Sequence, residues 1–302
     1  MRSKLPVYGG QAIIEGVMMR GSQACAIAVR APDRTITVKT ESLGGLYRHP
    51  AARLPLVRGL LMLWDALGLG MRALAFSADV QMGEEHKPSP RSMALTMATA
   101  IVLGIGLFFV FPAAVGYAAE RFLGASPGAA NLTEGLFRLL ILVGYVWAIG
   151  SWDEIRRVYA YHGAEHKTIN AFEAGAPLTV ESVGRFPVEH PRCGTAFLLT
   201  VAVFSILLFS ALGPLPLVTR LASRIALVPV VAALAYEYIR LTSRYAGLSW
   251  GRVLVAPNLA LQRLTTREPS PDMLEVALAA FEAMRATEPA PPNPNESPAP
   301  PA

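Results

Sequence analysis

The sequence has little charge and almost no cysteine. Only 16% of its 302 residues are charged, whereas soluble proteins average about 25%. Its two cysteines, Cys25 and Cys193, are too few for a secreted scaffold held together by several disulfides. The N-terminal segment lacks the apolar run of a signal peptide, so we expect it to stay uncleaved. These shortages exclude a disulfide-rich secreted domain and argue against an ordinary soluble enzyme.

Long uncharged segments are what the sequence contains instead. Hydrophobic residues make up 53% of the chain, and a helix needs about 20 apolar residues to cross a membrane core of about 30 Å. The segments that approach this length are 94–111, 136–152, 196–218 and 225–236, of which the last two form a hairpin. The sequence therefore predicts a mainly α, polytopic membrane protein with about four transmembrane helices in residues 93–240.

One charge falls inside these segments. Arg138 belongs to the second of them, and we expect it near the helix end, where its long side chain reaches the membrane surface. The predicted spans thus carry no paired charges, and they show no inverted repeat. A transporter is therefore not favoured.

The distribution of lysine and arginine predicts the orientation of the helices. Residues 1–94 contain twelve basic residues, residues 153–195 contain five and the chain from residue 240 onward contains six, whereas the two opposite loops contain three. Basic loops stay in the cytoplasm, so both termini and the loop 153–195 are expected there. The net charge of +5 then reflects a membrane topology. The expected partner is the lipid bilayer, and no specific nucleic acid is expected.

Residues 54–80 form a predicted helix that is apolar around most of its circumference. Its charges, Arg58, Asp65, Arg72 and Asp79, recur every seven residues with alternating sign and lie along one narrow seam. Because a charge in the membrane interior costs a few kcal/mol, we expect this helix at the cytoplasmic interface or packed on the bundle. The seam is then either its water-facing edge or a surface that contacts a partner or the rest of this protein.

The first 50 residues show the pattern of a small β-rich cytoplasmic segment. Apolar residues alternate over 25–29, and a second alternation covers 35–40 after a turn at 31–33. This pattern predicts a β-hairpin. Residues 13–19 could supply another strand.

The C-terminal cytoplasmic segment, residues 241–285, is expected to contain a helix. Ser270 is a natural N-cap and Pro271 suits the first helical position, so this helix should run to about Met284. Residues 286–302 contain too few apolar side chains to fold. They are predicted to be a disordered tail.

Histidine is scarce, and three of the five histidines lie in the loop 153–195 together with one of the two cysteines. His162 and His166 are four residues apart on a predicted helix that continues the second span and ends at Gly175, so both rings project from one face. With Glu165 they spell H-x-x-E-H, the inverted zinc-hydrolase motif, in which two histidines bind metal and the glutamate polarises water. The pattern predicts a site for a divalent metal, zinc above others.

Further ligands for this site are available before the third span. His190 and Cys193 lie three residues apart, and this turn returns to the membrane face from which His162 projects. Four protein ligands would make a closed, structural site, whereas three would leave a position for water. The alternative is that the histidine pair only forms hydrogen bonds with Tyr159, Asn170 or lipid phosphates.

A weaker candidate is Glu237, the only acid that the predicted spans place near the membrane core. An acid in this position is a candidate metal ligand or acid/base group. Pairing with Arg240 is the structural alternative.

Four blocks of the sequence carry a resemblance to a known family. They are GGQAIIEGVMMRG from Gly9, YHGAEHKTINAFEAG from Tyr161, HPRCGTAFLL from His190 and LQRLTTREPSPDMLEVALAA from Leu261. In this order they resemble the YqhQ-type family of bacterial multi-pass membrane proteins. This family is of unknown function and has been labelled a predicted metal-dependent enzyme, so the resemblance implies a bacterial inner-membrane protein and the same kind of activity that the spacing suggests.

The resemblance also draws attention to the N-terminal block, where Gln11, Glu15 and Arg20 lie among glycines. Such a segment could cover the site or bind a ligand, and Glu15 is a weaker candidate for a site residue. The alternative is that the glycines only permit close packing of strands.

Two functions follow from these patterns. The first is a membrane-embedded metal-dependent hydrolase with Glu165 as the catalytic residue, acting on a protein or lipid-linked substrate at the cytoplasmic face. The second is a non-catalytic scaffold or assembly factor for a ribosome, a translocon or a membrane complex. In the second, the histidines and Cys193 are a structural cluster. The sequence leaves the oligomeric state open.

Overall fold

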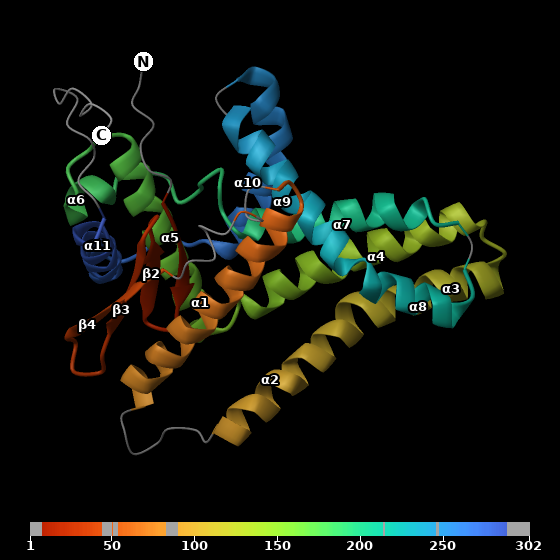
Figure 1. Cartoon of the computed structure of the whole chain (residues 1–302), viewed down its shortest axis with the longest axis horizontal. Coiled ribbons are helices and arrows are strands. Elements are labelled where there is room, and N and C mark those ends of the chain that lie inside the picture. Colours follow the sequence, from red (N-terminus) through yellow and green to blue (C-terminus); the bar gives the residue numbers. More distant parts are fainter. Residues whose placement is uncertain are drawn as a thin grey trace.

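The computed structural model describes residues 8–43, 50, 54–82, 90–213, 215–245 and 248–288. It is mainly helical and contains one four-stranded sheet (Figure 1). The elements in chain order are β1 (Gly9–Ile13), β2 (Gly16–Arg20), β3 (Ala24–Arg30), β4 (Ile36–Ser42), α1 (Val57–Met82), α2 (Pro90–Ile105), the π-helix η4 (Gly106–Val110), α3 (Phe111–Leu123), α4 (Pro127–Ile149), α5 (Asp153–Glu173), α6 (Val180–Val183), α7 (Thr195–Ser210), α8 (Leu217–Ala226), α9 (Val228–Tyr245), α10 (Ser249–Thr265) and α11 (Pro271–Ala286).

The sheet is an antiparallel meander in the order β1-β2-β3-β4. The predicted hairpin is confirmed as β3 and β4. The stretch 13–19, expected to supply one strand, instead spans the end of β1 and most of β2. Between them the chain turns at Glu15, whose φ of 51° lies in the left-handed region. The N-terminal segment is therefore a complete small sheet.

The two central strands, β2 and β3, are buried on both faces of the sheet, because helices cover each face (Figure 1). Val17 and Ala28 belong to the core formed with α5 and α11. Their neighbours Met18 and Ile27 point to the other face and pack against α1. Alternation along a strand thus supplies two cores, which explains why β2 and β3 are apolar on both faces. The sheet is the middle layer of this end of the molecule.

The seam of charges on α1 contacts the rest of the chain. Arg58 forms an ion pair with Glu237 on α9, and Asp65 lies 3.4 Å from Arg20. Farther along, Arg72 pairs with Glu41 on β4. The expectation of a water-facing edge is therefore replaced by the alternative, a surface that contacts this protein itself.

Among the residues that the structure describes, three continuous helical stretches are long and apolar enough to cross a membrane: Val57–Met82, Ala94–Leu123 and Pro127–Ile149. The pair Val218–Ala226 and Val228–Tyr245, bent by 42°, counts as a fourth if it is one span. The number agrees with the prediction, but the set includes α1 and leaves out α7, which has only 16 residues. The predicted third span, 196–218, is interrupted because α7 ends at Ser210 and Gly213 follows with a φ of 69°.

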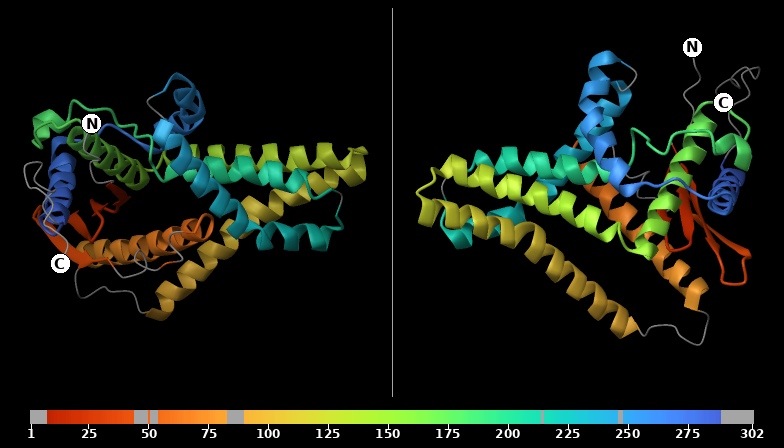
Figure 2. Two further views of the ribbon diagram at one scale, coloured as in Figure 1. Left: turned by 45° about the horizontal axis from the view of Figure 1, so that its top comes forward. Right: turned by 180° about the vertical axis from the view of Figure 1, so that it is seen from behind.

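The two further views show the long helical end of the molecule, where α4 and α7 run side by side (Figure 2). Inside it, Arg138 is buried and donates to Glu134 at 2.8 Å. The expectation that Arg138 reaches the membrane surface is wrong. The predicted second span begins at residue 136 and therefore leaves out Glu134, whereas α4 begins at Pro127 and contains it. The apolar helices therefore do contain paired charges, and this objection to a transporter fails.

The C-terminal region holds one helix more than expected. The helix α10 was not predicted, whereas α11 begins after Ser270 as its sequence indicates. The ordered chain continues into the predicted tail, because the carboxylate of Glu288 accepts hydrogen bonds from the backbone N–H groups of Ser22 at 2.6 Å and Gln23 at 2.8 Å. Residues 289–302 of the predicted tail lie outside the described residues.

Candidate metal centre

The helix α5 presents the H-x-x-E-H motif. It is a separate helix, not a continuation of α4, because the chain turns over Gly150 to Trp152 before α5 starts at Asp153. Its C-terminal end follows the prediction, since Gly175 has a φ of 70°, which glycine adopts without strain. One side of α5 packs on the sheet and α11. Another side faces the chain before α7 and the end of α10.

Three predicted ligands come together on this second side. The ligand atoms of His162, His166 and Cys193 all lie within 4.8 Å of one another. Nε2 of His162 is 3.1 Å from Sγ of Cys193. Ligands bound tetrahedrally to zinc at 2.0–2.3 Å lie about 3.5 Å apart, so a small inward movement would bring all three to that spacing. We call these three residues the His/Cys centre.

Backbone oxygens fix the orientation of both histidine rings through their Nδ1 atoms. Nδ1 of His162 lies 2.9 Å from the backbone oxygen of Thr265, and Nδ1 of His166 lies 2.5 Å from that of Val188. A backbone oxygen only accepts, so each Nδ1 carries the hydrogen and each Nε2 keeps its lone pair. Such outer partners are typical of metal-binding histidines. Burial favours the same state, because it lowers the pKa of His166.

Gly163, inside the H-x-x-E-H motif, allows another part of the backbone to approach α5 closely. A Cβ atom on Gly163 would collide with the backbone oxygen of Arg267. The backbone N–H of Arg267 also donates to the backbone oxygen of Tyr159 at 2.9 Å. This close approach holds the end of α10 against α5 and brings the backbone oxygen of Thr265 to His162.

Cys193 lies just before α7, whose N-cap is Gly194. Its Sγ is 3.4 Å from the backbone nitrogen of Thr195 and 3.1 Å from the Oγ1 of the same residue. The N-terminal end of a helix favours negative charge. This position therefore suits a sulfur that binds metal as an anion.

His190 lies beside the His/Cys centre but outside it. Gln262 holds its backbone, accepting from its N–H at 3.0 Å and donating to its carbonyl at 2.9 Å. The Nε2 atom is 3.5 Å from the carboxylate of Glu173. Burial alone would raise the pKa of Glu173, but His190 and Arg192 outweigh it and the pKa is lowered. The ring of His190 is thus directed to this carboxylate, with its centroid 5.8 Å from that of His166.

Glu165 is buried on the face of α5 that meets the first strand. Its carboxyl accepts a hydrogen bond from the backbone of Gly10, and a Cβ atom there would lie 3.0 Å from the carboxyl carbon. Burial raises the pKa of Glu165 to about 7, although His162 and Gly10 oppose this shift. Gly10 of the N-terminal block therefore lies against Glu165, and a Cβ atom on Gly10 or Gly16 would also collide with the backbone oxygen of a neighbouring strand, so the glycines permit close packing of strands as the alternative stated. The carboxylate is not a member of the His/Cys centre.

Comparison with known proteins agrees with the sequence blocks. Residues 54–287, more than half of the chain, match a family described as "Protein of unknown function (DUF1385)". The chain belongs to this family. It is also 34% identical over 291 residues, 91% of each chain, to the "Uncharacterized protein YqhQ" of Bacillus subtilis (strain 168). No solved structure matches it. The resemblance to the YqhQ-type family is confirmed.

The two weaker candidates lie in ion pairs away from the His/Cys centre. Glu237 accepts from Nε of Arg58 at 2.7 Å, so its partner is on α1 and not at the suggested Arg240. Glu15 accepts two hydrogen bonds of 2.5 Å from Arg157. Both acids join one part of the chain to another.

The groups suggested as alternative partners of the histidine pair are bound elsewhere. Asn170 donates to the backbone oxygens of Pro187 and Glu189. The hydroxyl of Tyr159 donates to the backbone oxygen of Val146. The partners that the histidines do have are backbone oxygens, at Thr265 and Val188. Sequence reasoning missed both, because any residue type carries a backbone oxygen. The fourth sequence block, which begins at Leu261, was the one available sign of this region's role.

Proposed function

We propose that this protein is a membrane-embedded metal-dependent enzyme of the hydrolase type, which binds zinc through His162, His166 and Cys193. The observation that carries the proposal is the convergence of these three ligand atoms with both Nδ1 atoms already bound to backbone oxygens. Zinc held by three protein groups supplies Lewis acidity and keeps a position open for water. The substrate class is a protein or a lipid-linked molecule.

Glu165 is the proposed acid/base group. A carboxyl with a pKa of about 7 exchanges its proton near neutral pH, which suits general acid/base catalysis. The N–H of Gly10 orients one oxygen, and His162 lies close enough to affect its charge. Its burial keeps bulk water from competing for the proton.

The proposed location is the cytoplasmic face of a bacterial inner membrane, with both termini in the cytoplasm. All four tryptophans are exposed, which supports contact with a membrane surface: Trp64, Trp147, Trp152 and Trp250 are 77%, 70%, 63% and 51% exposed, and tryptophan gathers where membrane meets water. The charged seam of α1 contacts the rest of the protein, whereas Trp64 and Leu67 of the same helix are exposed. We propose that α1 lies on the membrane surface.

Fluorescence quenching tests this placement of α1. A variant that keeps only Trp64, reconstituted in bilayers with lipids brominated at defined depths, should be quenched most by shallow bromines. The matched variant that keeps only Trp147 reports the neighbouring end of α4. Strongest quenching of Trp64 at the bilayer centre, or none, contradicts the proposal.

A second function is favoured by how deeply the His/Cys centre is enclosed. His166 and Cys193 are buried, and the centre joins three separate segments: α5, the chain before α7 and the end of α10. A metal there would act as a structural cross-link. The protein would then be a scaffold whose basic face contacts a ribosome, a translocon or a membrane complex.

Metal analysis tests the first step. Purified full-length protein should contain about one zinc per chain, and His162→Ala, His166→Ala or Cys193→Ala should each lower this content strongly. Cys25→Ala is the matched control, because Cys25 is also a buried free cysteine but lies in the sheet. Zinc content that is near zero in the wild type, or unchanged by all three substitutions, rules the centre out.

Glu165→Gln separates the two functions. If the protein is an enzyme, this variant keeps its zinc but does not restore a strain that lacks the gene. If the metal is only structural, Glu165→Gln restores the strain fully.

A further inference from the structure

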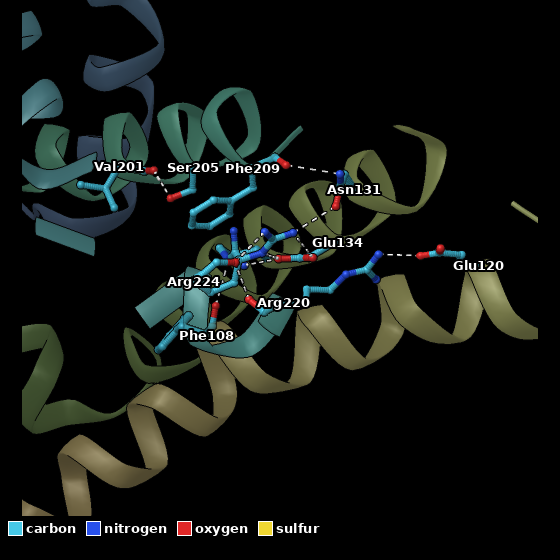
Figure 3. Close-up of polar contacts among 11 residues, drawn as sticks. Phe108, Glu120, Asn131, Glu134, Val201, Ser205, Phe209, Arg220 and Arg224 are labelled. Carbon is cyan, nitrogen blue, oxygen red and sulfur yellow. Dashed lines mark hydrogen bonds and ion pairs between the residues drawn. The ribbon is translucent and has the colours of Figure 1, made fainter. Parts of the chain in front are cut away.

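A second buried polar group lies at the other end of the molecule, where α3, α4 and α8 meet (Figure 1). Three arginines form it: Arg138 on α4, and Arg220 with Arg224 one turn apart on α8. All three are buried. We call them the arginine cluster (Figure 3).

A proline and a π-helix prepare the position of Arg138. Pro112 has no N–H, so it cannot donate to the backbone oxygen of Phe108 four residues before it. Phe108 lies in η4, and Nε of Arg138 donates to its oxygen at 2.9 Å. The guanidinium also lies over the ring of Phe209 at 5.3 Å. These two contacts fix the guanidinium in place without neutralising its charge, and its counter-charge is the carboxylate of Glu134.

The carboxylates that pair with the cluster are fewer than the arginines. Glu134 accepts from both Arg138 and Arg224, and Glu120 accepts from Arg220 at 2.5 Å. Arginine stays protonated in proteins, so the ion pairs formed by the described residues leave one positive charge in excess. Buried charge without a counter-charge is strongly unfavourable. The cluster is thus incomplete with respect to an anion.

Unused donors point to the same conclusion. Nη1 of Arg138 and Nη1 of Arg220 are buried and have no hydrogen-bond partner among the described residues. The nitrogens of Arg224, in contrast, bind Glu134, Asn131 and Ser223. Both oxygens of Glu134 are already used as acceptors. These two NH₂ groups are therefore available to an acceptor that the described residues do not supply.

An anion would reach the cluster from the protein surface at Glu120. Arg220 is 1% exposed, but the side chain of Glu120 that binds it is 30% exposed. The neighbouring Phe122, Leu123 and Val218 expose large apolar surfaces. An incoming anion would replace the Glu120 carboxylate at Arg220, with apolar side chains around the opening.

We propose that the arginine cluster binds a phosphate group at Arg220, in place of the Glu120 carboxylate. The planar fork of arginine matches the oxygens of phosphate and can bind two of them at once. The exposed apolar side chains suit the acyl chains of an anionic lipid whose phosphate binds Arg220, and a free phosphate ion offers the same oxygens. The site is separate from the His/Cys centre and does not depend on what that centre does.

Two binding experiments on the full-length protein identify the source of the phosphate. In phosphatidylcholine nanodiscs, inorganic phosphate is titrated and the melting temperature is followed. In a second set, native mass spectrometry measures how much phosphatidylglycerol the protein retains over phosphatidylcholine. A response to inorganic phosphate identifies the free ion, and selective retention of phosphatidylglycerol identifies the lipid. No response in either experiment overturns the proposal.

Two variants are expected to change phosphate binding in opposite directions, which distinguishes a change at the site from a loss of binding through misfolding. Arg220→Gln should weaken binding at least about tenfold, because it removes a charged hydrogen bond. Glu120→Gln should strengthen binding, because the competing carboxylate is gone. Arg121→Gln is the matched control, since Arg121 is exposed at the same end of α3 and should behave as the wild type. Binding that is unchanged in Arg220→Gln, or weakened in Glu120→Gln, contradicts the assignment.

Discussion

The two buried polar groups of this protein differ in what they leave unsatisfied. At the His/Cys centre the hydrogens of both rings are bound to backbone oxygens, so the atoms that remain are lone pairs on nitrogen and sulfur. At the arginine cluster the buried atoms that lack a partner among the described residues are N–H donors, the Nη1 atoms of Arg138 and Arg220. One group is prepared for a cation and the other for an anion.

The two groups are also held differently. Backbone carbonyls, which are neutral, orient the histidines, whereas a single carboxylate shared by two arginines holds most of the arginine cluster. Removing one side chain should therefore have unequal consequences. At the His/Cys centre a ligand is lost, but at the arginine cluster buried charges lose their counter-charge.

The largest effect is expected for Glu134→Ala. It leaves Arg138 and Arg224 buried without their carboxylate, which should cost about 3–5 kcal/mol of stability. The melting temperature of the full-length protein in detergent measures this loss. Asp153→Asn, at an exposed ion pair on α5, is the control and should change little. An unchanged melting temperature in Glu134→Ala would show that the cluster does not depend on this charge.

Gly163→Ala should have the next largest effect. The added methyl group meets the backbone oxygen of Arg267, and overpacking of this kind costs about 1–3 kcal/mol. Because it displaces the segment that carries Thr265, zinc content should fall as well. Gly144→Ala is the control, since nothing lies within 4 Å of its added methyl. If Gly163→Ala keeps both stability and zinc, the close approach has no role in positioning His162.

The smallest effect is expected for Arg72→Gln on α1. Its ion pair with Glu41 is polar like the two buried groups, but the side chain of Arg72 is 56% exposed. Exposed pairs contribute less than about 1 kcal/mol. A double-mutant cycle with Glu41→Gln measures the coupling. A value of several kcal/mol would remove the contrast between exposed and buried charge on which the comparison rests.

The sequence predicted the His/Cys centre more completely than the arginine cluster because its residues are rare. Three of five histidines and one of two cysteines fall in one loop, so their proximity in sequence was informative. Arginine is common here, and only Arg138 drew attention, with a location that proved wrong. The signal that could have found the cluster was Glu134, but the helix was expected to start two residues after it.

The fold was predictable where the pattern is local and not where it depends on contacts between distant parts. Alternation predicted the hairpin of β3 and β4, and the N-cap at Ser270 predicted the start of α11. The position of α1 between the sheet and α9 could not be predicted, because its seam of charges is equally compatible with water. Its partners, Arg20, Glu41 and Glu237, lie far away in the sequence.

The most direct test of the central claim is X-ray absorption at the zinc edge on the purified full-length protein. Our account predicts one sulfur at about 2.3 Å and nitrogen ligands at about 2.0–2.1 Å. The sulfur should disappear in Cys193→Ala and remain in the control Cys25→Ala. Zinc surrounded only by oxygen and nitrogen in the wild type, or a sulfur that persists in Cys193→Ala, would contradict the His/Cys centre.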